Sequence, residues 1–199
     1  MLKKIVPLIT LLAATLALTA CGDSDDSPDH EAHTASNGDS FNDADVEFAS
    51  DMIQHHAQAL TMVDLTIGRR LDPQVQRLAE DIRDAQGPEI EEMTDWLTAW
   101  DQPVPETVRD HANAHGGDME MDSDMPGMMS AEQMAELEAA QGAEFQAMWM
   151  EMMIEHHEGA IEKAQVEQDE GKYRPAKDLA AGIESAQQDE IATMEDLLG

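Results

Sequence analysis

Two adjacent pairs of histidines are the residues of this sequence best suited to hold a metal ion. His55-His56 and His156-His157 account for four of the eight histidines, and a methionine stands three positions before the first histidine of each pair. On a helix, residues four positions apart lie one above the other, so Met52 lies beside His56, and His55 lies about 100° round at the edge of the same face. The sequence therefore predicts that imidazole and thioether groups converge in each half of the chain.

A second segment in each half carries further polar and sulfur groups. A glutamine, a glutamate and a methionine follow one another at i, i+3 and i+7, the spacing of one helical face. We predict that each glutamate orients an imidazole by accepting a hydrogen bond from it. The predicted metal ligands are Met52, His55, His56 and Met93 in the first half and Met153, His156, His157 and Met194 in the second, supported by Gln86, Glu89, Gln187 and Glu190.

These donor types favour copper. Thioether and imidazole suit Cu(I), and by chemical analogy Ag(I), whereas a cage of carboxylates suits magnesium, calcium or manganese. Because thioethers do not form disulfides, such a site suits an oxidising compartment. The alternative is that methionines at helical spacing only fill a core and that each buried histidine pairs with a carboxylate, which describes a structural or interaction lipoprotein without a metal. The repetition of the histidine pair favours the metal.

The segment 101–129 between the two halves carries a further set of candidate ligands. Methionines recur there among glycines and aspartates, and an exposed, unstructured run of methionine has no packing reason to exist. Met148, Met150 and Met152 extend this richness into the next helix, where some of them must belong to the core. We predict secondary metal capture in the crossover by His111, His115, Met119, Met121, Met125, Met128 and Met129.

An internal repeat organises these residues. A shift of 101 positions aligns residues 45–97 with residues 146–198, and the two histidine pairs then coincide. The apolar residues follow the helical period, and prolines mark the breaks between segments. We predict helices over 45–70, 73–100, 130–169 and 175–198, which form an all-α four-helix bundle of two repeated helical pairs joined by the long crossover 101–129.

The first forty residues are typical of an exported lipoprotein. Two lysines precede an apolar run that is too short for a comfortable membrane-spanning helix. The run ends at Leu18-Thr19-Ala20-Cys21, which resembles the lipobox of bacterial lipoproteins, where the peptide is cut before the cysteine that carries the lipid. We predict a signal peptide over 1–20, lipidation of Cys21, a disordered tether over 21–40 and a bundle domain over 41–199, anchored to a membrane on the extracytoplasmic side of the cell envelope.

Charge and composition exclude several classes of function. The chain has 11 Lys and Arg against 43 Asp and Glu, a formal net charge of −32, which repels nucleic acid. Its one cysteine excludes a disulfide framework and a cysteine-ligated zinc site. The sequence has no glycine-rich phosphate loop and no serine nucleophile motif, so we predict no enzymatic activity. A metal oxidase is disfavoured, because methionine replaces the glutamate of the Glu-x-x-His motif of di-iron bundles.

The motif Met-Ile-x-His-His-x-x-Ala, followed by Leu-Ala-x-x-Ile-x-x-Ala-Gln-x-x-Glu-Ile-x-x-Met-x-x-x-Leu, resembles the domain-of-unknown-function 305 family over residues 41–199. The resemblance implies a ferritin-like helical bundle and a role like that of the family's extracytoplasmic copper- and silver-binding members, which are linked to metal tolerance. The family pattern also has an acidic residue ten positions before the histidine pair and a methionine seven positions after its first histidine. Asp45 and Met62 match this pattern, which adds Met62 to the first site, whereas Gln146 and Lys163 do not. We therefore expect the first site to be the tighter one, because Lys163 brings a positive charge near the second.

These features predict a lipid-anchored protein that binds Cu(I), and also Ag(I), outside the cytoplasm. Its role would be to buffer the metal, to confer tolerance or to pass the metal to a copper-transport partner. The expected partners are the metal ion and the lipid bilayer, and nucleic acid is excluded.

Overall fold

The structure, a computed structural model, describes residues 31–111 and 125–199. The predicted signal peptide, Cys21 and residues 21–30 of the predicted tether lie outside the described residues, as do His115, Met119 and Met121. Within the described ranges, no helix has the length and apolar character needed to cross a bilayer. The elements are β1 (His33–Thr34), β2 (Ser40–Phe41), α1 (Asp43–Asp64), α2 (Pro73–Ala99), α3 (Val108–His111), α4 (Ala131–Ala139), α5 (Gly142–Glu170) and α6 (Arg174–Leu198).

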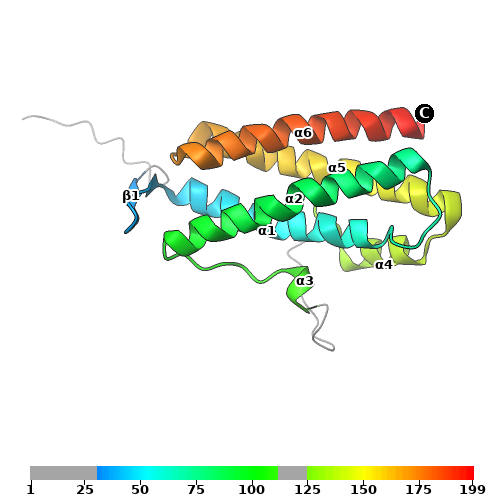
Figure 1. The fold of residues 1–199 in the computed structure, drawn as a ribbon, viewed down its shortest axis with the longest axis horizontal. Coiled ribbons are helices and arrows are strands. Elements are labelled where there is room, and N and C mark those ends of the chain that lie inside the picture. Colours follow the sequence, from blue (N-terminus) through cyan, green and yellow to red (C-terminus); the bar gives the residue numbers. More distant parts are fainter. Residues whose placement is uncertain (1–30, 112–124) are drawn as a thin grey trace, which may run out of the picture.

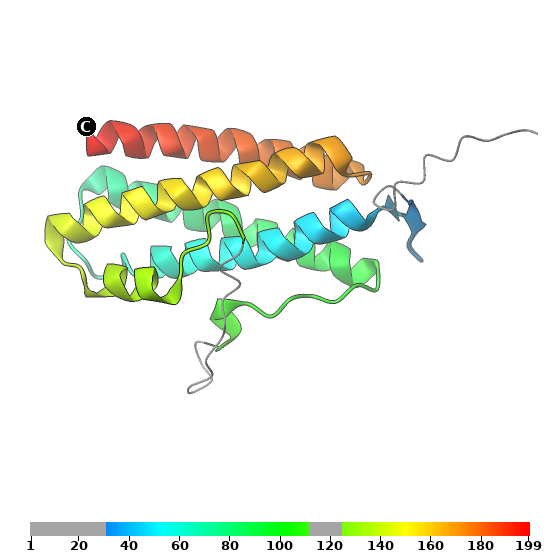
Figure 2. The same cartoon turned by 180° about the vertical axis from the view of Figure 1, so that it is seen from behind.

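Four long helices, α1, α2, α5 and α6, lie side by side as a bundle (Figure 1). α1 packs on α2 and α5 packs on α6, so each repeat forms one helical hairpin, and the two hairpins meet mainly along α1 and α5. These two helices run in opposite directions (Figure 2). The prediction of an all-α bundle made of two repeated helical pairs is confirmed. Residues 101 positions apart in the two repeats are called repeat equivalents below.

Capping side chains set where the helices begin. Asn42 accepts a hydrogen bond from the N–H of Asp45, and the Asp45 carboxylate accepts one from the N–H of Asn42 at 2.6 Å. Asp72 caps α2, which starts with a proline, and Ser130 caps α4 together with Gln133. Each cap satisfies a backbone N–H that no helical carbonyl can reach. The starts of these helices are therefore encoded locally.

Asp45 also ties the two hairpins together. Its Oδ1 accepts hydrogen bonds from the N–H groups of Lys172 and Tyr173 at 3.0 and 2.8 Å, so the start of α1 holds the loop between α5 and α6. Its repeat equivalent Gln146 accepts a hydrogen bond from the N–H of Asp72 at 2.7 Å and holds the loop between α1 and α2. Gln146, which departs from the family pattern, therefore makes the equivalent contact with an amide oxygen.

Glu167 lies buried near Asp45, and its burial predicts how the stability of the fold depends on pH. Burial, and then the hydrogen bond and charge of Asp45, raises the pKa of Glu167 to about 9. The folded protein keeps the Glu167 proton between pH 4.5 and 9, whereas the unfolded chain releases it, so stability falls as the pH rises through this range. We expect Glu167→Gln to increase the free energy of unfolding by roughly 3 kcal/mol at pH 8 and by little at pH 4.

Urea denaturation of both proteins at the two pH values measures this effect. The substitution keeps the volume of the side chain and a donor for Asp45. An equal change in stability at pH 4 and pH 8 would contradict the assignment of the proton to Glu167.

The first helix is shorter than predicted. α1 ends at Asp64 rather than near residue 70, and the chain turns at Thr66, whose hydroxyl donates to the carbonyl of Val63 at 2.6 Å. Gly68 then adopts a φ of 76°, a conformation that glycine tolerates far better than other residues. The prediction was wrong because the polar residues of this turn fit the helical period as well as they fit a loop.

The third predicted helix is in fact two helices. α4 ends at Ala139, and Ala140 is extended with φ −61° and ψ 151°. The guanidinium of Arg69 donates to the carbonyls of Glu138 and Ala140 at 2.8 and 2.7 Å, and its Cζ lies 3.8 Å from the centre of the Phe145 ring. These contacts satisfy carbonyls that the end of α4 leaves free. The break therefore depends on a residue far away in sequence.

Part of the predicted tether is folded, which corrects the expectation of disorder over 21–40. β1 and β2 pair in antiparallel fashion, with His33 opposite Phe41 and a turn at Gly38, whose φ is 96°. Phe41 is buried and stacks on Trp100, with ring centroids 4.5 Å apart. The segment orders because it covers aromatic rings at one end of the bundle, a gain in apolar burial that its own polar composition does not reveal.

The core divides into two clusters at opposite ends of the bundle. The aromatic cluster consists of Phe41, Phe48, Ala49, Met52, Ile53, Met93, Trp96, Leu97, Trp100, Ala160, Ala164, Ala176, Ala180 and Ile183. The methionine-rich cluster consists of Ala59, Met62, Val63, Val75, Leu78, Ala79, Ile82, Met129, Leu137, Ala140, Phe145, Trp149, Met150, Met152, Met153 and Met194.

Candidate metal centre

The two histidine pairs meet between α1 and α5. The rings of His55 and His156 lie in contact, with centroids 3.9 Å apart and planes tilted by 50°. All four imidazoles are buried, with 0 to 1% of each residue exposed. The antiparallel packing of α1 and α5 brings equivalent positions of the two repeats face to face. The two predicted sites therefore share one central histidine cluster, formed by His55, His56, His156 and His157, instead of lying apart.

A glutamate on the neighbouring helix fixes one histidine in each repeat. Nε2 of His56 lies 2.7 Å from Oε2 of Glu89, and Nε2 of His157 lies 2.7 Å from Oε2 of Glu190. A carboxylate accepts, so Nε2 carries the proton in both rings, and in a neutral ring the lone pair is then on Nδ1. The predicted proximity of Glu89 and Glu190 to imidazoles is present in the structure. Their role in orienting a metal ligand remains a prediction.

His55 is fixed by the backbone of the crossover. Its Nε2 lies 3.1 Å from the carbonyl oxygen of Pro126, and because a carbonyl only accepts, Nε2 is the protonated nitrogen. Burial lowers the pKa of His55 to about 3 and holds the pKa of His156 well below its ordinary value. Both rings are therefore neutral at physiological pH, and the lone pair of His55 is on Nδ1.

Several buried polar atoms of this region have no hydrogen-bond partner among the described residues. They include Nδ1 of three histidines, both ring nitrogens of His156 and side-chain atoms of two glutamines. Buried polar groups are normally paired, so such a concentration requires an explanation, and a ligand is one. The atoms are Nδ1 of His55, His56 and His157, Nδ1 and Nε2 of His156, Nε2 and Oε1 of Gln86 and Oε1 of Gln187.

Residues 125–130, named the strap here, cross the histidine cluster. Gln58 holds the strap by donating to the carbonyl of Met129 at 2.8 Å and accepting from its N–H at 2.7 Å. Gly127 has a φ of 76°, and a Cβ there would lie 2.8 Å from the carbonyl oxygen of Glu155. At Gly159 a Cβ would overlap the carbonyl of Pro126. The strap therefore lies directly against the helix backbone.

Sequence reasoning missed the residues that seat the strap. Gln58 and Gly159 are repeat equivalents of different type, and this mismatch within an otherwise well-aligned block was the available signal. The strap also corrects one expectation for the crossover, because Met129 is fully buried rather than exposed, whereas Met125 and Met128 are half-buried. His111 lies at the end of α3.

The predicted methionine ligands are all buried, but their grouping differs from the prediction. Met52 and Met93 belong to the aromatic cluster, whereas Met62 belongs to the methionine-rich cluster with Met153 and Met194. The structure therefore places Met62 in a different cluster from Met52 and Met93, and the role of each as a metal ligand stays a prediction. Position 62 lies two turns along α1 from the histidines, and there α1 faces the other repeat.

Lys163 also lies elsewhere than expected. It forms an ion pair with Asp51 of α1 and lines a cavity with Phe48 of the aromatic cluster. Its charge therefore lies on the side of the bundle that contains the aromatic cluster.

Histidines and carboxylates alone do not form a metal cage here. In residues 31–111 and 125–199, no three His, Cys, Asp or Glu side chains are placed to hold one ion between them. A metal ion bound at this centre would therefore need thioether ligands or a rotation of the imidazole rings. Soft thioethers beside neutral imidazoles are a donor set that fits Cu(I) and Ag(I).

Comparisons with known proteins agree on the fold. The sequence model of the DUF305 family, a domain of unknown function, matches residues 45–198 of this chain. A solved DUF305 protein from Streptomyces coelicolor, described as secreted, is 32% identical, with a TM-score of 0.67 over 78% of this chain and 91% of that chain. A DUF305 fragment from Deinococcus radiodurans is 31% identical, with a TM-score of 0.66 over 84% of this chain and 99% of that chain.

A third solved relative is a metal-binding protein. CopM in its Cu(I)-bound form is 26% identical, with a TM-score of 0.59 over 77% of this chain and 94% of that chain. Structures of CopM with Cu(II) and with Ag also match. No curated protein matches the chain.

Proposed function

We propose that this chain, which belongs to the DUF305 family, binds Cu(I) and Ag(I) at its central histidine cluster and adjacent methionines, outside the cytoplasm. A metal-binding role in general is supported by the copper- and silver-bound structures of CopM. The role is one of binding, either to buffer the metal or to transfer it, and needs no catalytic turnover.

The unpartnered nitrogens of the histidine cluster carry this proposal. Glu89, Glu190 and the Pro126 carbonyl occupy one nitrogen of each of three rings, and the other nitrogen, Nδ1, is buried without a partner. Carboxylate or carbonyl on one nitrogen with metal on the other is the usual arrangement of a histidine ligand. The buried methionines above and below the cluster supply the soft donors that select a monovalent ion.

The proposed location is the cell envelope, with the protein held there by a lipid on Cys21. The sequence around Cys21 resembles a lipobox, and the relative from Streptomyces coelicolor is described as a secreted protein. The tolerance of thioethers for an oxidising environment fits such a location. A transport partner that receives the metal is part of the same proposal.

An anaerobic Cu(I) titration tests the function. The full chain with Cys21→Ser, which removes the thiol, competes with a chromophoric Cu(I) chelator, with Zn(II) and Fe(II) as control metals. We expect saturable Cu(I) binding that weakens at least 100-fold, about 3 kcal/mol, when both contacting rings are replaced by His55→Gln and His156→Gln. Cu(I) should also raise the melting temperature of the parent protein.

The matched control is His33→Gln, which removes a part-exposed histidine that pairs with Asp43 at the β-hairpin. Its Cu(I) affinity should equal that of the parent. Thermal unfolding confirms that each variant is folded. A parent protein that cannot compete for Cu(I), and whose melting temperature ignores Cu(I) and Ag(I), would overturn the proposal in favour of a structural or interaction role.

A further inference from the structure

The two halves of the bundle differ in their sulfur content. Among the described residues, the methionine-rich cluster contains six buried methionines and the aromatic cluster contains two. Sequence repetition alone gives each half one methionine before the histidine pair and one on the partner helix. The excess in one half comes from Met62, Met129, Met150 and Met152.

Each cluster draws on both repeats. Met153 and Met194 come from the second repeat, and Met62 joins them from the first. The indole N–H of Trp149 on α5 donates to the carbonyl of Met62 at 3.0 Å, which fixes this pairing of α1 with α5. Helical side chains lean toward the N-terminus of their own helix, so Met62 and Met153, on antiparallel helices, lean toward each other.

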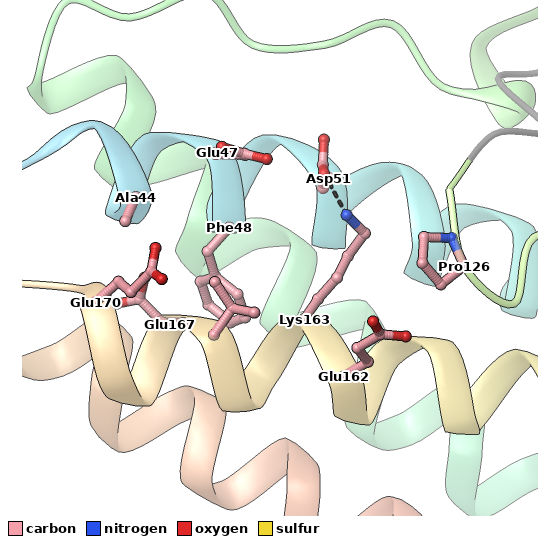
Figure 3. A pocket seen from close by; sticks show the side chains of 10 residues that line it. Ala44, Glu47, Phe48, Asp51, Pro126, Glu162, Lys163, Glu167 and Glu170 are labelled. Atoms are coloured by element: carbon pink, nitrogen blue, oxygen red, sulfur yellow. Dashed lines mark hydrogen bonds and ion pairs between the residues drawn. The ribbon is translucent and has the colours of Figure 1, made fainter. Parts of the chain in front are cut away.

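The equivalent place in the other half is occupied by an ion pair. Lys163 of α5 reaches across to Asp51 of α1, as Figure 3 shows. The repeat equivalents of Lys163 and Asp51 are Met62 and Met152, both members of the methionine-rich cluster. One half of the bundle therefore has two thioethers where the other half has an ammonium and a carboxylate.

The two places also differ in access to water. Met62 is fully buried, whereas Lys163 and Asp51 keep 17% and 22% of their side chains exposed. Lys163 lies on the wall of a cavity of about 160 Å³ that is also lined by Asp51 and Glu162 (Figure 3). A partly exposed wall that carries an ammonium and a carboxylate does not suit a soft monovalent ion, which prefers thioether donors. The ammonium group also repels a cation directly.

The strap increases the difference between the halves. Gln58 seats Met129 in the methionine-rich cluster through two backbone hydrogen bonds. Its repeat equivalent is Gly159, which only makes room for the strap to pass. The crossover therefore adds a thioether to the half that already contains Met62 and Met152.

We propose that the protein holds one soft monovalent ion, Cu(I) or Ag(I), in the methionine-rich half, and that the ion pair of Lys163 and Asp51 disables the other half. The ligands are thioethers of Met62, Met152, Met153 and Met194 together with imidazoles of the central histidine cluster, in which His157 lies one helical turn from Met153. This inference rests on the proposed function and reverses the expectation that the first site is the tighter one.

Paired leucine variants test the loss of binding. Leucine keeps the approximate volume of methionine without its sulfur, so the fold should be retained. Ag(I) is titrated into the full chain with Cys21→Ser, and native mass spectrometry counts the bound ions. The parent should bind one Ag(I) tightly, and ions captured by the predicted crossover ligands should bind more weakly than this one. Met153→Leu with Met194→Leu should weaken that binding at least 100-fold, whereas the equivalent pair, Met52→Leu with Met93→Leu, should weaken it less than threefold.

A gain of binding gives the sharper test. Asp51→Met with Lys163→Met reproduces the methionine-rich arrangement in the other half, and we expect two Ag(I) per chain. Asp51→Leu with Lys163→Leu removes the same charges without adding sulfur and should stay at one. Equal losses in the two leucine pairs, or a single Ag(I) in the double methionine variant, would overturn the assignment to one half. A parent that binds no Ag(I) would instead overturn the proposed function.

Discussion

Replacing Gly159 with alanine is expected to lower the free energy of unfolding by about 3 kcal/mol and to lift the strap from the histidine cluster. A Cβ at this position would overlap the carbonyl of Pro126 and the Cα of Gly127. Both are backbone atoms, so no side chain can rotate away, and the strap itself must move. That movement breaks the hydrogen bond between Pro126 and His55 and leaves a buried imidazole N–H without its acceptor.

Urea denaturation measures the loss of stability, and hydrogen exchange measures the movement of the strap. The N–H of Met129, which donates to Gln58, should exchange faster in the variant. Gly182→Ala is the matched control, because Gly182 lies inside α6 with nothing within 4 Å of its Cβ position. That variant should gain about 0.5–1 kcal/mol from the helix propensity of alanine. Equal effects of the two substitutions would show that the strap does not rest on Gly159.

Acid should unfold this protein through its central histidines. Burial holds the pKa of His55 at about 3 and the pKa of His156 well below 6.5, so the folded protein excludes two protons that the unfolded chain binds below pH 6.5. The contribution of these two histidines to stability is therefore fully present above pH 6.5 and is lost as the pH decreases toward 3. Glu167→Gln removes the opposing pH dependence of the buried Glu167 carboxyl. In this variant, we expect the free energy of unfolding to fall by about 2.7 kcal/mol per pH unit between pH 6 and 4.

The slope comes from urea denaturation at several pH values. Replacing His156 with glutamine removes one of the two excluded protons, so the slope should fall to about half. The substitution His33→Gln changes a part-exposed histidine instead and should leave the slope unaltered. An unchanged slope in the His156 variant would show that its ring is protonated, or accessible to protons, in the folded state.

Much of the fold follows from local patterns. The helical period, the capping residues Asn42 and Asp72 and the prolines between segments indicate the four long helices, and α2 and α6 match their predicted bounds within one residue. The 101-residue repeat reveals the two hairpins. The position of Glu89 on the inner face of the second predicted helix indicates its hydrogen bond with an imidazole, which is that of His56. These features are accessible because each depends on residues within one helix or one helical hairpin.

Other features depend on residues far apart in the chain. Arg69 ends α4, Trp100 orders the N-terminal β-hairpin, and Gln58 seats Met129, and none of these partners is indicated by the local sequence of the segment it holds. Such contacts form only after the two hairpins have packed together. The folded part of the predicted tether was missed for this reason.

The sequence by itself determined which groups can bind a metal: two histidine pairs, their glutamates and an excess of methionine. Only the tertiary structure decided how these groups are combined. Antiparallel packing of α1 against α5 brings His55 onto His156 and places Met62 with the methionines of the opposite repeat. The same packing puts Lys163 against Asp51 at the equivalent place in the other half. The two repeats carry similar residues at equivalent positions. Which of these side chains come into contact depends on how the helices of one repeat pack against those of the other.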